Sequence, residues 1–283
     1  MSDEDCVIDS ETGTEVPSLN SHGSSLPLKP PLKWAGGKRW LAEEIRKIWY
    51  PFRNLEYVEP FCGGLSVALD LRPQKALLND INPHLINFYT NLKQGFYIEM
   101  EMKNERSFYY EKRDQFNDSI DTGSVDRRMQ ASLFYYLNRT CFNGLCRFNN
   151  SGHFNVPFGK YKTINYKRDF SIYRKSFEKW SFTCEYFERM DLDDESFVYA
   201  DPPYDVEFTK YATDDFTWND QNRLIRWLDR HDGPIVISNQ ATDRITNLYL
   251  DHGYNVSNIS APRFINANGD RSRAVEIIAT KNI

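Results

Sequence analysis

Strand-length apolar runs alternate with segments of helical period early in this chain, and that alternation constrains the fold more than any other feature. Residues 57–59 and 75–79 have the pattern of strands, and residues 38–49, 65–71 and 83–92 have the pattern of helices. Consecutive strands joined by helices form parallel sheets. The pattern therefore predicts an α/β fold with a doubly wound, mostly parallel, Rossmann-like sheet. Further strands are predicted at 182–184, 197–200, 234–238 and 275–280.

The alternation stops between about residues 96 and 180. Residues 97–117 and 127–138 have helical periods, and a loop rich in Asn, Gly and Phe follows at 139–162. A mainly helical insert in the sheet domain is the simplest explanation. We expect residues 31–95 and 181–283 to form one domain and 96–180 to form the insert.

Charge is distributed unevenly along the chain. The formal net charge is −5, but residues 1–28 hold six acidic residues and no Lys or Arg. Residues 1–30 are also rich in Ser, Gly and Pro, so we predict a disordered acidic tail there. Residues 139–168 hold six Lys or Arg and no acidic residue. This segment is either a solvated basic loop or a surface for a phosphate backbone.

The composition argues against several classes of protein. Five cysteines without a CxxC spacing indicate free thiols, and scattered histidines give no metal-ligand spacing, so we expect no metal. No run approaches the roughly 18 apolar residues of a membrane span, and the first residues lack a secretory signal. We expect a cytoplasmic protein without a membrane or an obligate protein partner.

Asp201-Pro202-Pro203-Tyr204 directly follows the predicted strand at 197–200. It therefore lies at the carboxyl edge of the sheet, where open α/β sheets bind ligands. The prolines fix the backbone, so that a carboxylate, a rigid carbonyl and an aromatic ring are held together. Such a set suits a planar group with an exocyclic NH₂, because the two oxygens accept its protons and the ring stacks on its plane. A Pro-Pro turn capped by an aspartate would explain the same four residues without any ligand.

A second motif, EPFCGG at 59–64, also lies between a strand and a helix. Its paired glycines allow close approach of a ligand to the backbone. Asp80 follows the next strand, where a carboxylate can accept hydrogen bonds from ribose hydroxyls or cap the helix at 83. The absence of GxGxxG speaks against a nicotinamide oxidoreductase.

Together, KWAGGK at 33–38, EPFCGG at 59–64, NDIN at 79–82, LNRTCFNGLCRFNNSGHFNVPFGKY at 137–161 and DPPY at 201–204 resemble the Dam-type DNA adenine-N6 methyltransferases. The order of the motifs is that of the alpha class of amino-methyltransferases. The resemblance covers about residues 32 to 280 and implies a methyltransferase sheet, S-adenosylmethionine as cofactor and double-stranded DNA as substrate. It also implies methylation of adenine N6 within GATC, with the base flipped out of the stack.

The resemblance assigns roles to individual residues. Asp201, Pro202, Pro203 and Tyr204 would hold the target base, and Asp201 would accept positive charge from its amine. The cofactor would contact Trp34, Ala35, Gly36, Lys38, Glu59, Phe61, Gly63, Asp80, Ile81, Tyr186, Phe187 and Asp201, with core packing an equal alternative for Tyr186 and Phe187. The DNA would contact Phe142, Asn143, Leu145, Arg147, Pro157, Lys160 and Lys162.

Among these DNA contacts, Arg147 would read guanine, Leu145 and Pro157 would contact the thymine methyl, and Phe142 would fill the vacated stack. In the family the position of Phe142 is often Tyr, and Phe loses only a hydroxyl. Two alternatives stay open at this stage, namely methylation of cytosine N4 and a DNA-binding protein that has lost catalysis. The sequence also leaves open whether the enzyme acts alone, belongs to a phage or partners a restriction nuclease.

Overall fold

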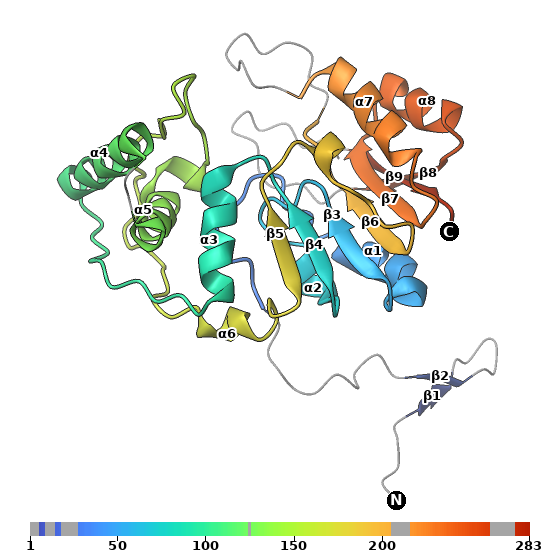
Figure 1. The fold of residues 1–283 in the computed structure, drawn as a ribbon, viewed down its shortest axis with the longest axis horizontal. Helices are drawn as coiled ribbons and strands as arrows, with labels where there is room; N and C mark the ends of the chain where they lie inside the picture. The colour runs from blue at the N-terminus through green and yellow to red at the C-terminus, as the bar shows by residue number, and fades with distance from the viewer. Residues whose placement is uncertain (1–5, 9–14, 18–27, 124–125, 205–215, 261–274) are drawn as a thin grey trace, which may run out of the picture.

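The computed structural model describes residues 6–8, 15–17, 28–123, 126–204, 216–260 and 275–283. Most of these residues belong to one α/β body with the insert on one side (Figure 1). The expected acidic tail lies largely outside the described residues, and within it strands β1 (Cys6–Ile8) and β2 (Glu15–Pro17) pair in antiparallel orientation. Within the described residues, no helix is long and apolar enough to cross a membrane.

A seven-stranded sheet in the order β5-β4-β3-β6-β7-β9-β8 forms the centre of the body. Strands β5, β4, β3, β6 and β7 run parallel, and β9 is antiparallel to both of its neighbours. The predicted fold class is therefore confirmed. The strands are β3 (Glu56–Glu59), β4 (Ala76–Asn79), β5 (Trp180–Thr183), β6 (Ser196–Ala200), β7 (Ile235–Gln240), β8 (Asn255–Ser260) and β9 (Val275–Lys281).

Alternate side chains of the central strands enter two separate apolar cores. Tyr57 and Phe197 lie in one core, whereas Val58 and Val198 lie in the other. Helices α1 (Ala42–Trp49), α2 (Ala68–Leu71) and α3 (Pro83–Lys93) contribute to the first core, and α7 (Trp218–Leu228) and α8 (Asp243–Asp251) contribute to the second. Because both faces are covered, the strands read as continuous apolar runs rather than alternating ones.

The insert packs against the sheet domain through α3. Its main helices are α4 (Arg106–Thr122) and α5 (Arg127–Thr140), with the short α6 (Ser171–Arg174) below them in Figure 1. After α5 the chain folds back on itself, since Cys141 bridges Phe158 and Phe148 bridges Phe154. We call residues 141–158 the recognition hairpin, because they hold five of the seven residues that were predicted to contact DNA.

Three predictions of helical extent were wrong. The helix predicted at 38–49 begins at Ala42, because the chain turns before it, with Leu41 N donating to the Lys38 carbonyl at 2.9 Å. The helix predicted at 97–117 begins only at Arg106, because Tyr97 pairs with Asp169 as an isolated β-bridge and Glu105 is extended. The helix predicted from residue 65 begins at Ala68, because Leu65 has φ of 59°. All three departures come from contacts or turns that helical periodicity does not encode.

Candidate functional site

A cavity of about 880 Å³ opens at the carboxyl edge of the sheet, at the boundary between β3 and β6. On one side of this boundary the chain adds β4 and β5 to the sheet, and on the other side it adds β7. Ligands bind at such switch points in open α/β sheets. Every residue predicted to be catalytic or to bind the cofactor lies in its walls. These residues are Trp34, Ala35, Gly36, Lys38, Glu59, Phe61, Gly63, Asp80, Ile81, Tyr186, Phe187, Asp201, Pro202, Pro203 and Tyr204.

The loop after β3 needs its glycines because Trp34 lies directly against them. A Cβ atom at Gly63 or at Gly64 would lie 2.7 Å from the Trp34 side chain. Gly63 also has φ of 42°, and its carbonyl accepts a hydrogen bond from the Tyr89 hydroxyl at 2.6 Å. Any larger residue would push the indole out of the cavity wall.

Asp80 is fixed at the end of β4 by two backbone amides. Its Oδ2 accepts from Gly63 N at 3.1 Å, and its Oδ1 accepts from Asn82 N at 2.9 Å. Burial raises the pKa of Asp80, and the two amides oppose this rise. Each oxygen keeps a second lone pair for a ligand hydroxyl.

Glu59 is a buried carboxyl group that faces the same cavity. Burial raises its pKa to about 8, although a hydrogen bond donated by the Tyr57 hydroxyl at 2.5 Å opposes the shift. The neutral form of Glu59 is therefore favoured more strongly than in an exposed glutamate.

Large apolar side chains stand exposed at one end of the cavity. Ile81 is 62% exposed and Tyr186 is 45% exposed, while the adjacent Phe187 is only 3% exposed. Phe187 packs on Phe61 with ring centroids 5.6 Å apart. Of the two aromatic residues for which binding and packing were equal alternatives, Tyr186 thus presents free apolar surface and Phe187 belongs to the core as well as to the wall.

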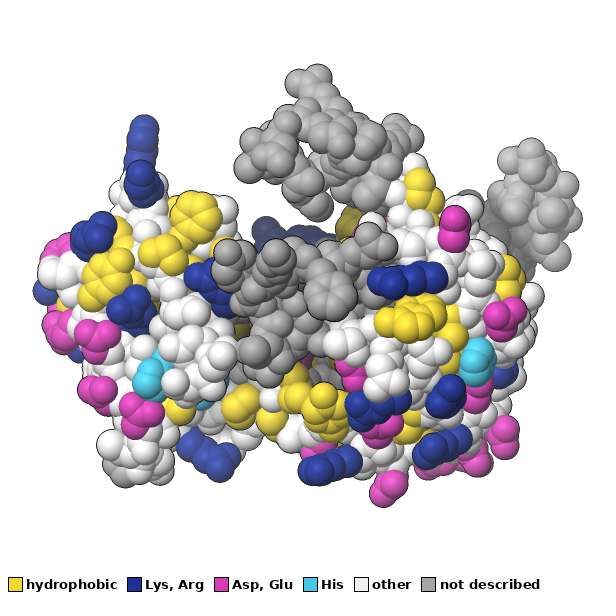
Figure 2. Space-filling model, turned by 90° about the horizontal axis from the view of Figure 1, so that it is seen from above, with side chains coloured by type: hydrophobic (Ala, Val, Ile, Leu, Met, Phe, Trp, Pro, Cys, Tyr) yellow, Lys and Arg dark blue, Asp and Glu magenta, His cyan; other side chains and the backbone are white. Residues whose placement is uncertain are grey.

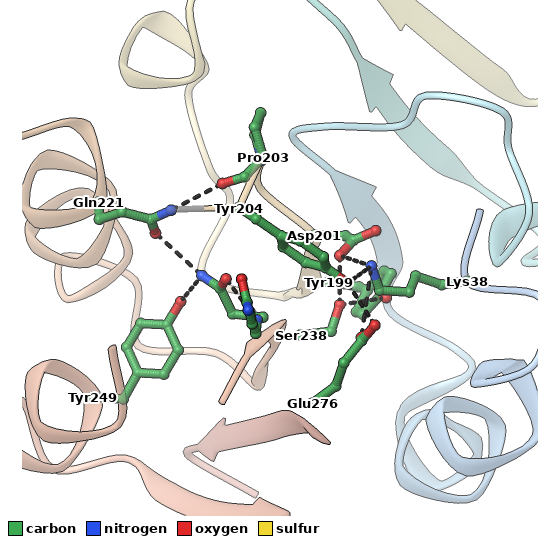
Figure 3. A network of polar contacts seen from close by, with 11 residues as sticks. Lys38, Tyr199, Asp201, Pro203, Tyr204, Gln221, Ser238, Tyr249 and Glu276 are labelled. Carbon is green, nitrogen blue, oxygen red and sulfur yellow. Dashed lines mark hydrogen bonds and ion pairs between the residues drawn. The ribbon is translucent and has the colours of Figure 1, made fainter. Parts of the chain in front are cut away.

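Asp201 and Tyr204 meet Lys38 in a compact polar network (Figure 3). Lys38 Nζ lies 2.9 Å from Asp201 Oδ1 and donates to the Tyr204 hydroxyl at 3.0 Å. The Ser238 hydroxyl donates to the same Oδ1 at 2.8 Å. Within the described part of the chain, the hydrogen bonds to this carboxylate all reach Oδ1, so Oδ2 is left for a ligand.

The pKa values of this network follow from burial and charge together. Burial raises the pKa of Asp201, while Lys38 opposes the rise. Burial by itself would lower the pKa of Lys38, but the attraction of Asp201 and the bond to Tyr204 raise it overall. Burial and the bond to Glu276 raise the pKa of Tyr204 to about 12.

Several polar residues of the site were not predicted. The Tyr204 hydroxyl donates to Glu276 Oε1 at 2.5 Å, and Gln221 Nε2 donates to the Pro203 carbonyl at 2.9 Å. Gln221 is in turn held by Asn239 at 3.2 Å. Only Glu276 left a signal in the sequence, as the one charged residue within the apolar run at 275–280.

None of the predicted DNA contacts lines the cavity, although Phe148 and Gly152 of the recognition hairpin do. Phe142 is 48% exposed, and Arg147 is exposed while its Nε donates to Asn155 Oδ1 at 2.8 Å. Phe142 N donates to the Pro157 carbonyl at 2.8 Å, so the two predicted contacts lie side by side. Asn143, Pro157, Lys160 and Lys162 are exposed and Leu145 is half-buried.

Basic and apolar side chains share the surface of the insert that surrounds the hairpin. In Figure 2, Lys and Arg side chains stand beside apolar side chains on the half of the molecule that carries α4 and α5, and Asp and Glu side chains lie along the outer edge of the same half. Lys33, just outside the hairpin, lies 3.8 Å from the centre of the Tyr161 ring and donates to the Arg139 carbonyl. A mixed surface of this kind suits phosphates and bases together.

The cysteines and the histidine of this region are buried or packed against neighbouring side chains. Cys62 and Cys141 are buried, and burial raises the pKa of Cys146 to about 12. His84 stacks on Phe148 with centroids 5.1 Å apart, and burial lowers its pKa to about 4. Across the described ranges, no group of three or more His, Cys, Asp or Glu is placed to hold a metal ion.

Comparison with known proteins agrees with this geometry. Residues 34–263 match the family model of the D12 class N6 adenine-specific DNA methyltransferases. A DNA adenine methylase of Vibrio cholerae is 37% identical over 271 residues, which cover 88% of this chain and 94% of the relative. The retron Ec67 DNA adenine methylase of Escherichia coli is 35% identical over 262 residues, covering 88% of this chain and 90% of the relative. The DNA adenine methylase of Escherichia coli K12 is 35% identical over 265 residues, covering 87% and 92%.

Proposed function

The chain belongs to the D12 class of N6 adenine-specific DNA methyltransferases, and from this premise we propose that it transfers a methyl group from S-adenosylmethionine to adenine N6 within GATC of double-stranded DNA. The observation that carries the proposal is the joining of two chemically different regions in one cavity. One region has free apolar surface and the carboxylates of Asp80 and Glu59, and the other has Asp201 and Tyr204.

The first region fits S-adenosylmethionine. Ile81 and Tyr186 offer exposed apolar surface to a purine, and Asp80 offers lone pairs to ribose hydroxyls. Glu59 and the ring of Trp34 suit the cationic methionine part. When bound, S-adenosylmethionine supplies a methyl group on a sulfonium, which needs no further activation.

The second region suits the target amine. The unoccupied acceptor Oδ2 of Asp201 can accept one N6–H, and the ring of Tyr204 can stack on the adenine. Positive charge that develops on N6 is stabilised by the Asp201 carboxylate, which Lys38 and Ser238 already hold in place. A stacked base in a duplex does not reach such a cavity, so the adenine must be flipped out.

The recognition hairpin is the part proposed to read the sequence. Arg147 has the donor pattern for guanine O6 and N7, and Leu145 and Pro157 have apolar groups for the thymine methyl. Phe142 has nearly half of its surface free to fill the gap left by the flipped base. Asn143, Lys160 and Lys162 would contact the DNA beside them.

We also propose a division of labour along the chain. Residues 31–95 and 181–283 would bind the cofactor and carry out the transfer, and residues 96–180 would bind DNA. Both parts line the cavity, since Phe148 and Gly152 lie in its walls and Phe148 stacks on His84 of α3 with ring centroids 5.1 Å apart.

The decisive experiment is methylation of short duplexes followed by mass analysis of the nucleosides. We expect N6-methyladenine on a GATC duplex and much less on duplexes changed at one position of GATC. Formation of N4-methylcytosine, or equal methylation of all the duplexes, would contradict the proposal. Digestion of treated plasmid with nucleases that require or reject methylated GATC provides an independent check.

A further inference from the structure

Glu276 is a carboxylate buried near the start of the apolar strand β9. It is 7% exposed and pairs in register with Gln240 at the end of β7, next to the catalytic end of β6. Lys, Glu, Arg and Asp are rarely buried unless they are paired. Its burial in this strand therefore depends on its partners.

Both oxygens of Glu276 face the proposed catalytic residues (Figure 3). Oε1 accepts from the Tyr204 hydroxyl at 2.5 Å. Oε2 lies 3.7 Å from Lys38 Nζ and has no hydrogen-bond donor among the residues that the structure describes. One oxygen is thus used for a bond and the other faces a shared ammonium group.

Lys38 consequently lies between two carboxylates, Asp201 at 2.9 Å and Glu276 at 3.7 Å. Counted together, the three side chains carry a net charge of −1 when all are ionised. A buried ion pair becomes strongly unfavourable when one of its partners is neutralised and nothing replaces it. With Asp201 as the sole partner, Lys38 would be left unpaired whenever Asp201 became neutral.

We propose that Glu276 is a positioning residue that acts as the second counter-ion of Lys38 and keeps this lysine paired while Asp201 stabilises the positive charge on the target amine and then accepts its proton. The inference rests on the proposed function, because it assigns the amine to Asp201. Glu276 itself acts through Lys38 and Tyr204 rather than on the base.

The charge balance of the reaction explains why a second carboxylate is useful. N6 forms its bond to the methyl carbon while the electron pair of the carbon–sulfur bond stays on sulfur, and N6 then carries one positive charge. N6 next gives a proton to Asp201, which becomes neutral, and the methylated amine is neutral too. Lys38 and Glu276 remain as a neutral pair until Asp201 releases the proton to water.

Three substitutions separate charge from shape. Glu276→Gln keeps an acceptor for Tyr204 and nearly the same volume but removes the charge, Glu276→Asp keeps the charge, and Glu276→Ala removes both.

For Glu276→Gln we expect the single-turnover rate at saturating cofactor and DNA to fall about 10- to 100-fold, because a small loss of alignment and charge has effects of that size. Glu276→Asp should retain more activity than Glu276→Gln. Cofactor affinity should stay within a few-fold of the unchanged chain in both.

The pH dependence of the methylation rate tests the charge of Glu276, because a purely structural role of Glu276 would leave this pH dependence unchanged. Several segments of the chain contribute charged groups near Asp201. Among these groups, the negative charge of Glu276 raises the pKa of Asp201. Removing that charge should move the acid limb of the rate profile to lower pH. The charged and titratable groups around Asp201 are Lys38, Tyr57, Glu59, Tyr199, Tyr204, Tyr249 and Glu276.

Lys281→Gln is the matched control on the same strand, since Lys281 pairs with Asp229 at 2.7 Å and lies outside the cavity. It should react at the unchanged rate. A folded Glu276→Gln variant with a rate within twofold of the unchanged chain would overturn the inference, and so would an unmoved acid limb. Asp201→Ala is measured in parallel: if the unchanged chain methylates GATC and Asp201→Ala does not, the proposed function stands whatever Glu276 does.

Discussion

The cavity and the recognition hairpin hold their functional groups in opposite ways. In the cavity, Asp201 is fixed by Lys38 from before α1 and by Ser238 from β7, so that residues distant in sequence hold one another in a low-dielectric setting. In the hairpin, Arg147 is held by Asn155, which is eight residues away on the opposite arm. The first arrangement is preorganised by the whole fold, whereas the second depends on a local, exposed contact.

The difference indicates where each kind of substitution should act. A change in the cavity removes a group that no neighbour can replace, so the rate or the cofactor affinity should change sharply. If the hairpin reads the duplex as proposed, a change in it should leave the chemistry intact and alter which duplexes are accepted. The predictions below test this contrast, starting from the largest expected effect.

Asp201→Ala should lower turnover by about 10³-fold, because it removes the proposed acceptor for the target amine. Cofactor affinity should stay within a few-fold, since the proposed contacts to the cofactor lie mainly elsewhere. Single-turnover methylation and cofactor titration measure the two effects. Ser238→Ala, which removes only the bond that holds Oδ1, should cause a much smaller loss of rate. Equal losses in both variants would mean that Asp201 acts only as part of the framework.

Asp80→Ala should show the converse behaviour within the same cavity. We expect cofactor affinity to fall about 10- to 100-fold, as for loss of a hydrogen bond to a charged group, with a smaller change in the rate at saturation. Isothermal titration with S-adenosylhomocysteine provides the affinity. Asp70→Ala is the control, because Asp70 pairs with Arg46 outside the cavity, and it should bind as the unchanged chain does. Unchanged affinity in Asp80→Ala would remove the ribose assignment.

Arg147→Ala should cost about 1 to 3 kcal/mol at one base pair and relax discrimination there. Turnover is measured on GATC and on each singly altered duplex. Asn155→Ala leaves the guanidinium in place and removes only its support, so it should weaken discrimination less. A uniform loss on all duplexes in Arg147→Ala would indicate that the arginine anchors a phosphate, and the contrast between cavity and hairpin would then concern affinity alone.

Removing Lys160 and Lys162 together should weaken all sequences alike. If both meet phosphates, the slope of log K against log salt should become shallower by about 0.9 for each lysine. Lys175→Gln, at the end of α6, is the control and should leave the slope unchanged. An altered preference among duplexes in the double variant would show that these lysines contact bases, and would contradict their assignment to phosphates.

The same contrast explains what the sequence could and could not predict. The parallel strands, and the cavity residues of EPFCGG, NDIN and DPPY, were predictable because these three motifs follow apolar runs, and the carboxyl ends of parallel strands meet at one edge. Trp34 and Lys38 follow no strand, and only the resemblance to a family predicted their place in the site. The late start of α4 was not, since it depends on a bridge from Tyr97 to Asp169 across 72 residues. Strand β8 is polar and mostly exposed, so its sequence has no apolar pattern to detect.

The network around Asp201 was only half predictable for a related reason. Lys38, Asp201 and Tyr204 belong to motifs with a fixed spacing, whereas Ser238 and Glu276 join them only through the pairing of β6, β7 and β9. Strand order is a property of the folded sheet, and nothing local in the sequence of β9 specifies its neighbours. Glu276 could be noticed as a charge in an apolar run, but not placed.

The smallest effect is expected from removing residues 1–27. This segment contains none of the predicted cavity or hairpin residues, and it carries six acidic residues and no Lys or Arg. A chain that begins at Leu28 keeps the first contacts of the body, in which Leu28 packs against the core, the Lys29 carbonyl accepts from the Tyr173 hydroxyl at 2.6 Å and Leu32 is buried. Specificity should therefore be unchanged. Because six acidic residues and no basic ones are removed, association with DNA should become slightly faster at low salt and equal at high salt. Stopped-flow association at several salt concentrations tests this, and a shortened chain with altered preference among duplexes would mean that the tail contributes to reading beside the hairpin.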